Sequence, residues 1–256
     1  MRHEIVHASA AASAVAVGYD AEKALDQNLQ SGWCTDNGGM LTIELGRPVA
    51  ADRVVVTPGL QDKRTEEMID RSPSMEVALD LKGFAPAVGE TPDADTIVVP
   101  VVDGRVSRIT VKLPENGMRG CIASLTVEQA GKPHSLLFLQ DEGRIAELMA
   151  TIDRLRKALS TCDGPGLYEL STFPLTYIYV GREGTGRATS RHNKRTISTV
   201  GELLAMCRPA PFRETLVREV DASTVAVEAN GDFTLRYKPI GGWKLVELPD
   251  DYPSRH

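Results

Sequence analysis

The chain has 256 residues, of which 42% are hydrophobic and 25% are charged, and its formal net charge at pH 7 is −6. This composition excludes global disorder, because enough apolar surface is present to offset the entropy of ordering the chain. The absence of a run of about 18 apolar residues excludes a transmembrane helix. The acidic balance argues against nucleic acid as a partner, since such binding depends on neutralising phosphates. The length indicates one or two domains.

The N-terminal residues lack the pattern of a secretory signal peptide. Such a signal combines a positive start with an apolar core of large side chains. Residues 8–17 are small instead, and Glu4 interrupts the start. The chain is therefore either cytoplasmic or a mature form whose leader has been removed.

The four cysteines are Cys34, Cys121, Cys162 and Cys207, and none belongs to a C-x-x-C pair. Zinc-ribbon and thioredoxin sites are thus disfavoured. Two cysteines precede residue 130 and two follow it, which leaves two interpretations. One is a disulfide in each half, Cys34–Cys121 and Cys162–Cys207, formed in an oxidising compartment. The other is four buried thiols in a reducing cytoplasm.

The first half of the chain alternates short strand patterns with turn residues. The expected strands are residues 41–45, 53–57, 75–79, 96–102, 106–113 and 122–127. Glycines and prolines separate them, as turns require. Many strands with almost no helix favour an all-β sandwich over residues 1–130.

A break at residues 129–135 predicts a linker, placed at 131–137, before a second domain at 138–256. Apolar residues between 145 and 159 keep helical spacing, and residues 162–166 end that helix. A strand is expected at 173–180, a hairpin at 181–195 and a helix at 198–207 with Ser198 as its cap. Strands follow at 214–220, 224–228, 233–237 and 243–248, with a turn at Asn230-Gly231. This order predicts an α+β domain.

The most informative motif lies in residues 24–33. Asp26, Asn28 and Ser31 offer oxygen atoms at a spacing that a calcium ion can use. The same groups can instead hold a tight turn through hydrogen bonds to the backbone. Trp33, which follows, is interpreted as a buried anchor for this turn.

Several short motifs occur in the order found in one known family. They are Ala8-Ser9, residues 24–26 with Asn28, Ser31 and Trp33, residues 41–46 with Pro48, Gly59-Leu60-Gln61, Lys63-Arg64, residues 71–73, and residues 121–125. Over roughly residues 5–130 the chain resembles the discoidin, or coagulation-factor C-terminal, type of galactose-binding-like jelly roll. Within that group it is similar to the NADase-type glycan-binding domains. The resemblance implies a jelly-roll sandwich that binds glycans through loops at one end.

The positions that match those loops are the expected ligand-binding residues Asp36, Asn37, Gln61, Lys63, Arg64 and Arg71. Calcium-binding relatives carry a glutamate on the closing strand, where this chain has Ser124. The resemblance thus implies an incomplete ligand set for calcium at Asp26, Asn28 and Ser31. The alternative to a glycan site is that Lys63, Arg64 and the glutamates after them form a solvated loop.

Residues 138–248 resemble the NTF2-like cone fold, with its curved antiparallel sheet, through their element order, Phe173-Pro174-Leu175 and the final strand at 242–248. Such cones enclose a pocket and some are enzymes, so Tyr168, Tyr177 and Tyr179 are candidate pocket residues. No nucleophile with a nearby base can be identified, which argues against catalysis.

A basic stretch contains Arg182, Arg187, Arg191, His192 and Arg195. It is interpreted either as a binding hairpin for an anionic partner or as a solvated hairpin.

The favoured hypothesis is a non-catalytic binding protein of the bacterial envelope, periplasmic or extracellular, that recognises a glycan or a protein. The first alternative is an immunity-type protein that neutralises a toxin, because NTF2-like domains recur in such proteins. The second is an enzyme with a pocket in the cone.

Overall fold

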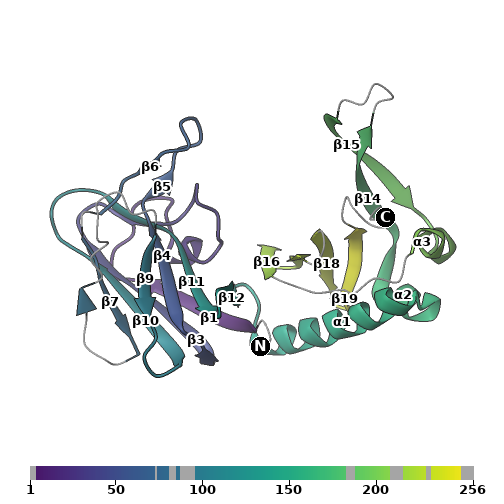
Figure 1. The fold of residues 1–256 in the computed structure, drawn as a ribbon, viewed down its shortest axis with the longest axis horizontal. Coiled ribbons are helices and arrows are strands. Elements are labelled where there is room, and N and C mark those ends of the chain that lie inside the picture. Colours follow the sequence, from purple (N-terminus) through teal and green to yellow (C-terminus); the bar gives the residue numbers. More distant parts are fainter. Residues whose placement is uncertain are drawn as a thin grey trace. The chain divides into compact units, whose positions relative to one another are not determined.

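A computed structural model describes residues 4–72, 74–80, 85–86, 96–182, 188–207, 216–228 and 232–248. The chain divides into two compact units, Met1–Glu142 and Gly143–His256, and each is treated by itself. Figure 1 shows strands throughout the first unit, whereas the second combines helices with a sheet.

Two sheets form the first unit. One has the order β13 (Ser135–Leu137), β1 (Ile5–Ala12), β3 (Gly39–Ala50), β10 (Arg105–Leu113), β7 (Glu76–Leu79), β8 (Ala85–Pro86). The other has the order β12 (Lys132–Pro133), β11 (Gly120–Gln129), β4 (Arg53–Pro58), β9 (Ile97–Pro100), and β2 (Trp33–Thr35) also pairs with β11. A short hairpin of β5 (Leu60–Gln61) and β6 (Met68–Ile69) stands outside both sheets, and a 3-10 turn covers Ala21–Ala24.

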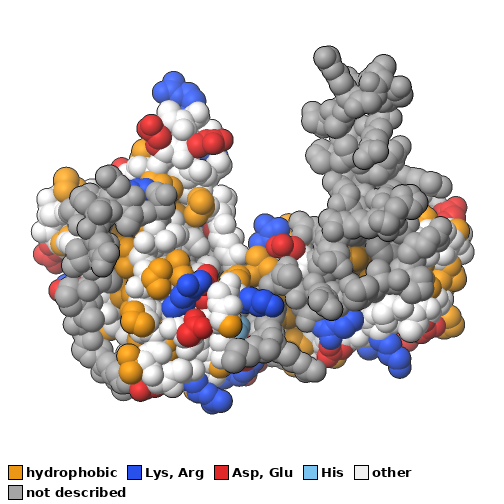
Figure 2. Space-filling model, viewed as in Figure 1, with side chains coloured by type: hydrophobic (Ala, Val, Ile, Leu, Met, Phe, Trp, Pro, Cys, Tyr) orange, Lys and Arg blue, Asp and Glu red, His pale blue; other side chains and the backbone are white. Residues whose placement is uncertain are grey.

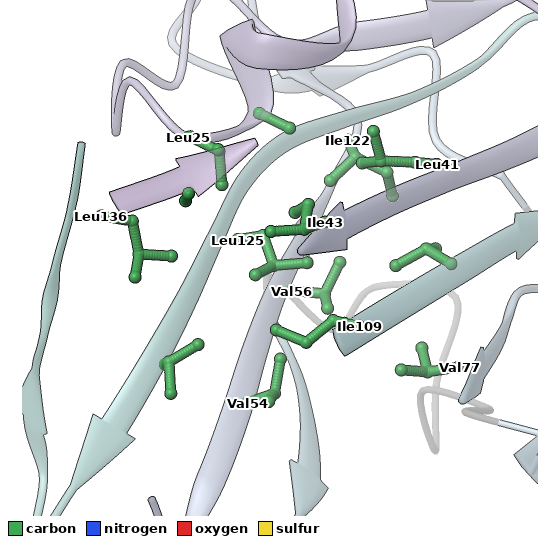
Figure 3. Packing of buried hydrophobic residues seen from close by; sticks show 14 of the residues in the cluster. Leu25, Leu41, Ile43, Val54, Val56, Val77, Ile109, Ile122, Leu125 and Leu136 are labelled. Carbon is green, nitrogen blue, oxygen red and sulfur yellow. The ribbon is translucent and has the colours of Figure 1, made fainter. Parts of the chain in front are cut away.

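A shared apolar core joins the two sheets, which confirms the predicted β sandwich. On β3 the buried residues alternate with outward ones, as the two-residue period of a strand requires. Ile43 is paired with Ile109 of β10, and both are fully buried. Figure 3 shows these side chains meeting Val54, Val56 and Leu125 of the opposite sheet.

The segment predicted as a linker, residues 131–137, is part of the sandwich instead. Its residues form β12 and β13, and β13 pairs in parallel with β1. His134 lies between these strands and is only 2% exposed. Its Nε2 atom lies 2.8 Å from the carbonyl oxygen of Ala50, and its Nδ1 atom accepts a hydrogen bond from the backbone N–H of Glu4. Gly131 serves a hairpin turn after β11, with a φ of 74°. Glycine and proline mark turns within a domain as well as linkers between domains, so the prediction was wrong.

The second unit begins with α1 (Glu142–Thr161) and α2 (Gly164–Leu170). Strands β14 (Ser171–Arg182) and β15 (Ala188–Ile197), helix α3 (Val200–Met206), and strands β16 (Leu216–Asp221), β17 (Thr224–Glu228), β18 (Asp232–Lys238) and β19 (Gly242–Leu248) follow. The sheet order is β15-β14-β19-β18-β17-β16, with β14 parallel to β19 and the other neighbours antiparallel. The predicted turn at Asn230-Gly231 lies outside the described residues.

Helix α1 has the predicted apolar face, in which Ile145, Leu148, Ile152 and Leu155 are buried. Near its start the backbone carbonyl of Arg144 accepts a hydrogen bond from the indole of Trp243 on β19, at 3.1 Å. This bond satisfies a buried polar group while the indole ring adds apolar area to the core.

The cap of α3 is Thr199 rather than the predicted Ser198. The Thr199 hydroxyl accepts a hydrogen bond from the backbone N–H of Glu202 at 3.2 Å, and the Glu202 carboxylate accepts one from the backbone N–H of Ser198 at 2.6 Å. Thr199→Ala is therefore expected to destabilise this helix by about 1 kcal/mol. Ser198→Ala is the matched control, because Ser198 contributes only its backbone. Faster amide hydrogen exchange in α3 for the first variant alone would support the assignment, and equal effects would contradict it.

Both predicted disulfides are present, so the free-thiol interpretation is wrong. Cys34–Cys121 spans 87 residues within the first unit, and Cys162–Cys207 spans 45 residues within the second. Each covalent link therefore constrains the unfolded chain of one unit only.

Candidate functional site

The loops at one end of the first unit converge on the Cys34–Cys121 disulfide. Both cysteines are fully buried and lie opposite each other on β2 and β11. The carbonyl of Cys34 accepts a hydrogen bond from Ala16, the carbonyl of Cys121 accepts one from Gly59, and the N–H of Cys121 donates to Asp70. A small apolar cluster that includes Leu60, with Tyr19 and Met68 packed against it, surrounds the sulfur atoms. The loops thus stand on a rigid base.

On this base lies a group of polar and aromatic side chains, Tyr19, Asp36, Asp70 and Arg119, named here the Arg119 cluster. The Nε atom of Arg119 donates to Oδ1 of Asp36 at 2.8 Å, and its guanidinium carbon lies 5.6 Å from the centre of the Tyr19 ring. The hydrogen bond to Asp36 raises the pKa of Arg119, and the charge of Asp70 adds to the effect. With side chains 42% and 65% exposed, the Arg119–Asp36 pair contributes little to stability.

The exposure of the cluster matters more for recognition. It presents a charged donor, the Asp36 carboxylate as an acceptor and the ring of a half-buried tyrosine within one small area, and the charge of Asp70 is near enough to act on Arg119. The ion pair and the cation–π contact hold the guanidinium in place before any ligand arrives. Fixed donors and acceptors beside an apolar platform are the usual elements of a small-molecule site.

The motif of residues 24–33 forms a hydrogen-bonded turn. The carboxylate of Asp26 accepts from the backbone N–H of Asn28 at 2.8 Å and from the hydroxyl of Ser31 at 2.7 Å, and the Asn28 side chain accepts from Gln30. These hydrogen bonds support the turn interpretation. In the described part of the chain, no group of three or more His, Cys, Asp or Glu side chains is placed to hold a metal ion.

Trp33, which ends the motif, is fully buried, and its indole N–H donates to the carbonyl of Ala14 at 2.9 Å. Its predicted role as an anchor is confirmed.

The β5–β6 hairpin carries three of the predicted ligand residues. Gln61 is half-buried at its base, where its backbone N–H donates to the carbonyl of Leu29 at 2.7 Å. Lys63 and Arg64 are exposed at its tip, and Figure 2 shows basic side chains there with acidic ones beneath them. Arg71 follows the hairpin and is half-buried. The tip thus has the exposure expected of the solvated-loop alternative.

Asp62 organises this hairpin. Its carboxylate accepts hydrogen bonds from the backbone N–H groups of Thr65 and Arg64, which lower its pKa from the ordinary 3.8. Because the pKa of Asp62 is lowered, its ionised carboxylate stabilises the folded state at pH values above the ordinary pKa. This stabilisation is lost as the pH falls through the folded-state pKa. We therefore expect the amide resonances of Arg64 and Thr65 to titrate in NMR spectra with a midpoint below 3.8. The Asp62→Ala variant serves as the control and should abolish this titration, whereas a midpoint above the ordinary value would contradict the assignment.

The predicted ligand residues fall into two groups. Asp36 belongs to the Arg119 cluster, and the side chain of Asn37 accepts a hydrogen bond from the backbone N–H of Gly117 at 2.9 Å. Gln61, Lys63, Arg64 and Arg71 belong to or follow the hairpin.

Sequence reasoning missed Tyr19, Asp70 and Arg119. The expected Cys34–Cys121 disulfide points toward Arg119 only once the antiparallel register of β2 and β11 is known, because that register sets residue 119 opposite residue 36. For Tyr19 and Asp70 the sequence contains no such signal.

The predicted basic hairpin is described only in part. Arg182 lies on β14, and Arg191, His192 and Arg195 lie on β15, where His192 pairs with Val180 through the backbone. Arg187 lies outside the described residues. The anionic-partner hypothesis therefore stays a prediction. Of the candidate pocket tyrosines, Tyr168 is 65% exposed and stacks on Phe173, which places it at the surface; Tyr177 and Tyr179 lie on β14.

No family model matches the chain, and no curated protein matches it. Solved structures of carbohydrate-binding modules and lectin domains match about half of it. A family 32 carbohydrate-binding module of Clostridium perfringens NanJ, solved with galactose, is 20% identical, covers 47% of this chain and 92% of its own, and has a TM-score of 0.37. The lectin domain of lectinolysin, solved with Lewis B antigen, is 18% identical over 48% and 93%, with a TM-score of 0.39. The family 32 module of AlyQ, solved with 4,5-unsaturated mannuronic acid, is 18% identical over 51% and 99%, with a TM-score of 0.38.

Among the described residues, no helix combines the length and the apolar character needed to cross a membrane.

Proposed function

We propose that the first unit is a non-catalytic, galactose-binding-like domain that holds a glycan on the Arg119 cluster. The observation that carries this proposal is the geometry of Arg119, held between the Asp36 carboxylate and the Tyr19 ring on a disulfide-linked base. Sugar hydroxyls both donate and accept hydrogen bonds, so a site with fixed donors and acceptors suits them. The ring offers a surface for the apolar face of the sugar. A preformed site also lowers the entropy lost on binding.

We infer further that the second unit is an NTF2-like cone. Support comes from its element order, with two helices, two strands, a helix and four strands, and from the parallel pairing of β14 with β19 in the middle of the sheet. The two disulfides support a periplasmic or extracellular location at the bacterial envelope, because disulfides persist in oxidising compartments. Recognition of a protein, the toxin-neutralising role and an enzymatic pocket stay predictions from the sequence.

A glycan array followed by calorimetric titration of the hits tests the proposed function. We expect Arg119→Ala to raise the Kd about tenfold or more, because a hydrogen bond to a charged group contributes roughly 1.5–3 kcal/mol to binding. Arg108→Ala is the matched control: Arg108 is 41% exposed and pairs with Glu44 at 2.6 Å, but on β10.

An array without any hits would contradict glycan binding. Equal Kd values for the wild type and Arg119→Ala would instead contradict the location of the site. Titrations with added calcium and with a chelator test the sequence prediction of an ion at Asp26, Asn28 and Ser31; an unchanged Kd and melting temperature would contradict it.

A further inference from the structure

Two Asn-Gly pairs meet at the loop end of the first unit. They are Asn37-Gly38, after β2, and Asn116-Gly117, between β10 and β11. A hydrogen bond joins them, since the Asn37 side-chain oxygen accepts from the backbone N–H of Gly117 at 2.9 Å. In an Asn-Gly pair the missing side chain of glycine lets its backbone nitrogen approach the side-chain carbonyl carbon of the asparagine. Such a pair can therefore lose ammonia and become aspartate or isoaspartate.

The surroundings of the two glycines differ, although their backbone conformations are nearly the same, with φ values of 71° for Gly38 and 72° for Gly117. Gly38 is buried, and a Cβ atom built on it would lie 2.7 Å from the backbone of Pro114 and Glu115. A Cβ atom built on exposed Gly117 would meet nothing within 4 Å. The close backbone neighbours of Gly38 therefore restrict the backbone rotation that brings nitrogen to carbon after Asn37, whereas the open space around Gly117 leaves room for it after Asn116.

We propose that Asn116 is a site of spontaneous deamidation and that Asn37 is protected. The backbone nitrogen of Gly117 gives its proton to a solvent base and bonds to Cγ of Asn116. The Cγ–Nδ2 bond breaks, and the nitrogen leaves as ammonia after taking up a proton. Water then adds to one of the two carbonyl carbons of the succinimide ring and cleaves its C–N bond. The products are aspartate or isoaspartate at position 116.

Two hydrogen bonds act on this step in opposite directions. The side-chain oxygen of Asn116 accepts from the backbone N–H of Met118 at 3.0 Å. This donor stabilises the negative charge that the oxygen gains when Cγ is attacked. The bond from Gly117 to Asn37 instead occupies the hydrogen that the attacking nitrogen must lose. Asn37 thus restrains the reaction of Asn116, and the product would add a carboxylate to the loop that carries Arg119.

The two pairs can be compared within one sample of the full chain. The protein is kept folded in a mildly alkaline buffer, and portions are digested with trypsin and analysed by mass spectrometry. After reduction of the disulfides, cleavage after Lys112 and Arg119 isolates Asn116, whereas Asn37 lies in the peptide between Lys23 and Arg53, because trypsin does not cut the bond between Arg47 and Pro48. We expect conversion of –NH2 to –OH at Asn116 to run several-fold faster than at Asn37. In concentrated urea with reductant, both positions should react at similar rates. Equal rates in the folded protein would overturn the proposal.

The restraint by Asn37 is tested with the Asn37→Ala variant. Removing the acceptor for the Gly117 N–H should speed the conversion of Asn116 several-fold in the folded protein and leave its rate in urea unchanged. Circular dichroism verifies that the variant is folded. An unchanged rate in the folded variant would overturn the assigned role of Asn37.

Discussion

Removing the Cys34–Cys121 disulfide, by the double substitution Cys34→Ala and Cys121→Ala, is expected to destabilise the first unit by about 4–5 kcal/mol. The bond closes a long loop, with a sequence separation of 87, and so removes much of the entropy of the unfolded chain. Its loss also opens a gap in the apolar cluster beneath the Arg119 cluster, because both sulfur atoms are fully buried. We therefore expect lower stability together with weaker binding at the proposed glycan site.

The second disulfide supplies the matched control. Replacing Cys162 and Cys207 by alanine should destabilise the second unit and leave binding at the proposed glycan site unchanged, since this bond lies wholly within residues 143–256. Amide hydrogen exchange, followed peptide by peptide in urea, measures the stability of each unit separately. If peptides from β11 exchanged their amide hydrogens as slowly in the first double variant as in the wild type, the structural role assigned to Cys34–Cys121 would be contradicted.

Gly32→Ala is expected to destabilise the first unit by about 1–3 kcal/mol, the usual cost of overpacking. A Cβ atom at this position would clash with the carbonyl oxygen of Ile122 and would lie 2.8 Å from the Cα atom of Ala123. Both are backbone atoms of the central strand β11, so neither can move aside cheaply. The turn that contains Asp26 would have to lift from the sheet, and Trp33 would lose part of its packing.

Gly201→Ala serves as the control with the opposite sign. Gly201 lies within helix α3, and the nearest atom to its Cβ position is the Thr199 hydroxyl at 3.8 Å. Alanine there should stabilise the second unit by about 0.5–1 kcal/mol. Urea unfolding with hydrogen exchange distinguishes the two units. A neutral Gly32→Ala variant would show that the turn is not held against β11.

The sequence by itself determined the elements whose signal is local. Alternation of apolar and polar residues identified the core of β3, a short apolar run between turn residues indicated β4, and the three- and four-residue spacing of apolar residues identified α1. Local signals also have limits. Strand β1 (Ile5–Ala12) was missed because a run of alanines has little preference for a strand, and only its pairing between β3 and β13 orders it.

The tertiary structure decided what residues distant in the sequence do together. Asp36 was predicted as a ligand residue from its loop, but its partner Arg119 lies 83 positions away and meets it only through the register of β2 and β11. The same holds for residues 131–137. Their glycine and proline are equally compatible with a linker and with a hairpin, and only the pairing of β13 with β1 shows that this segment belongs to the sandwich. Periodicity depends on one element alone, whereas a binding site depends on which elements become neighbours, and that is set by the packing of the whole unit.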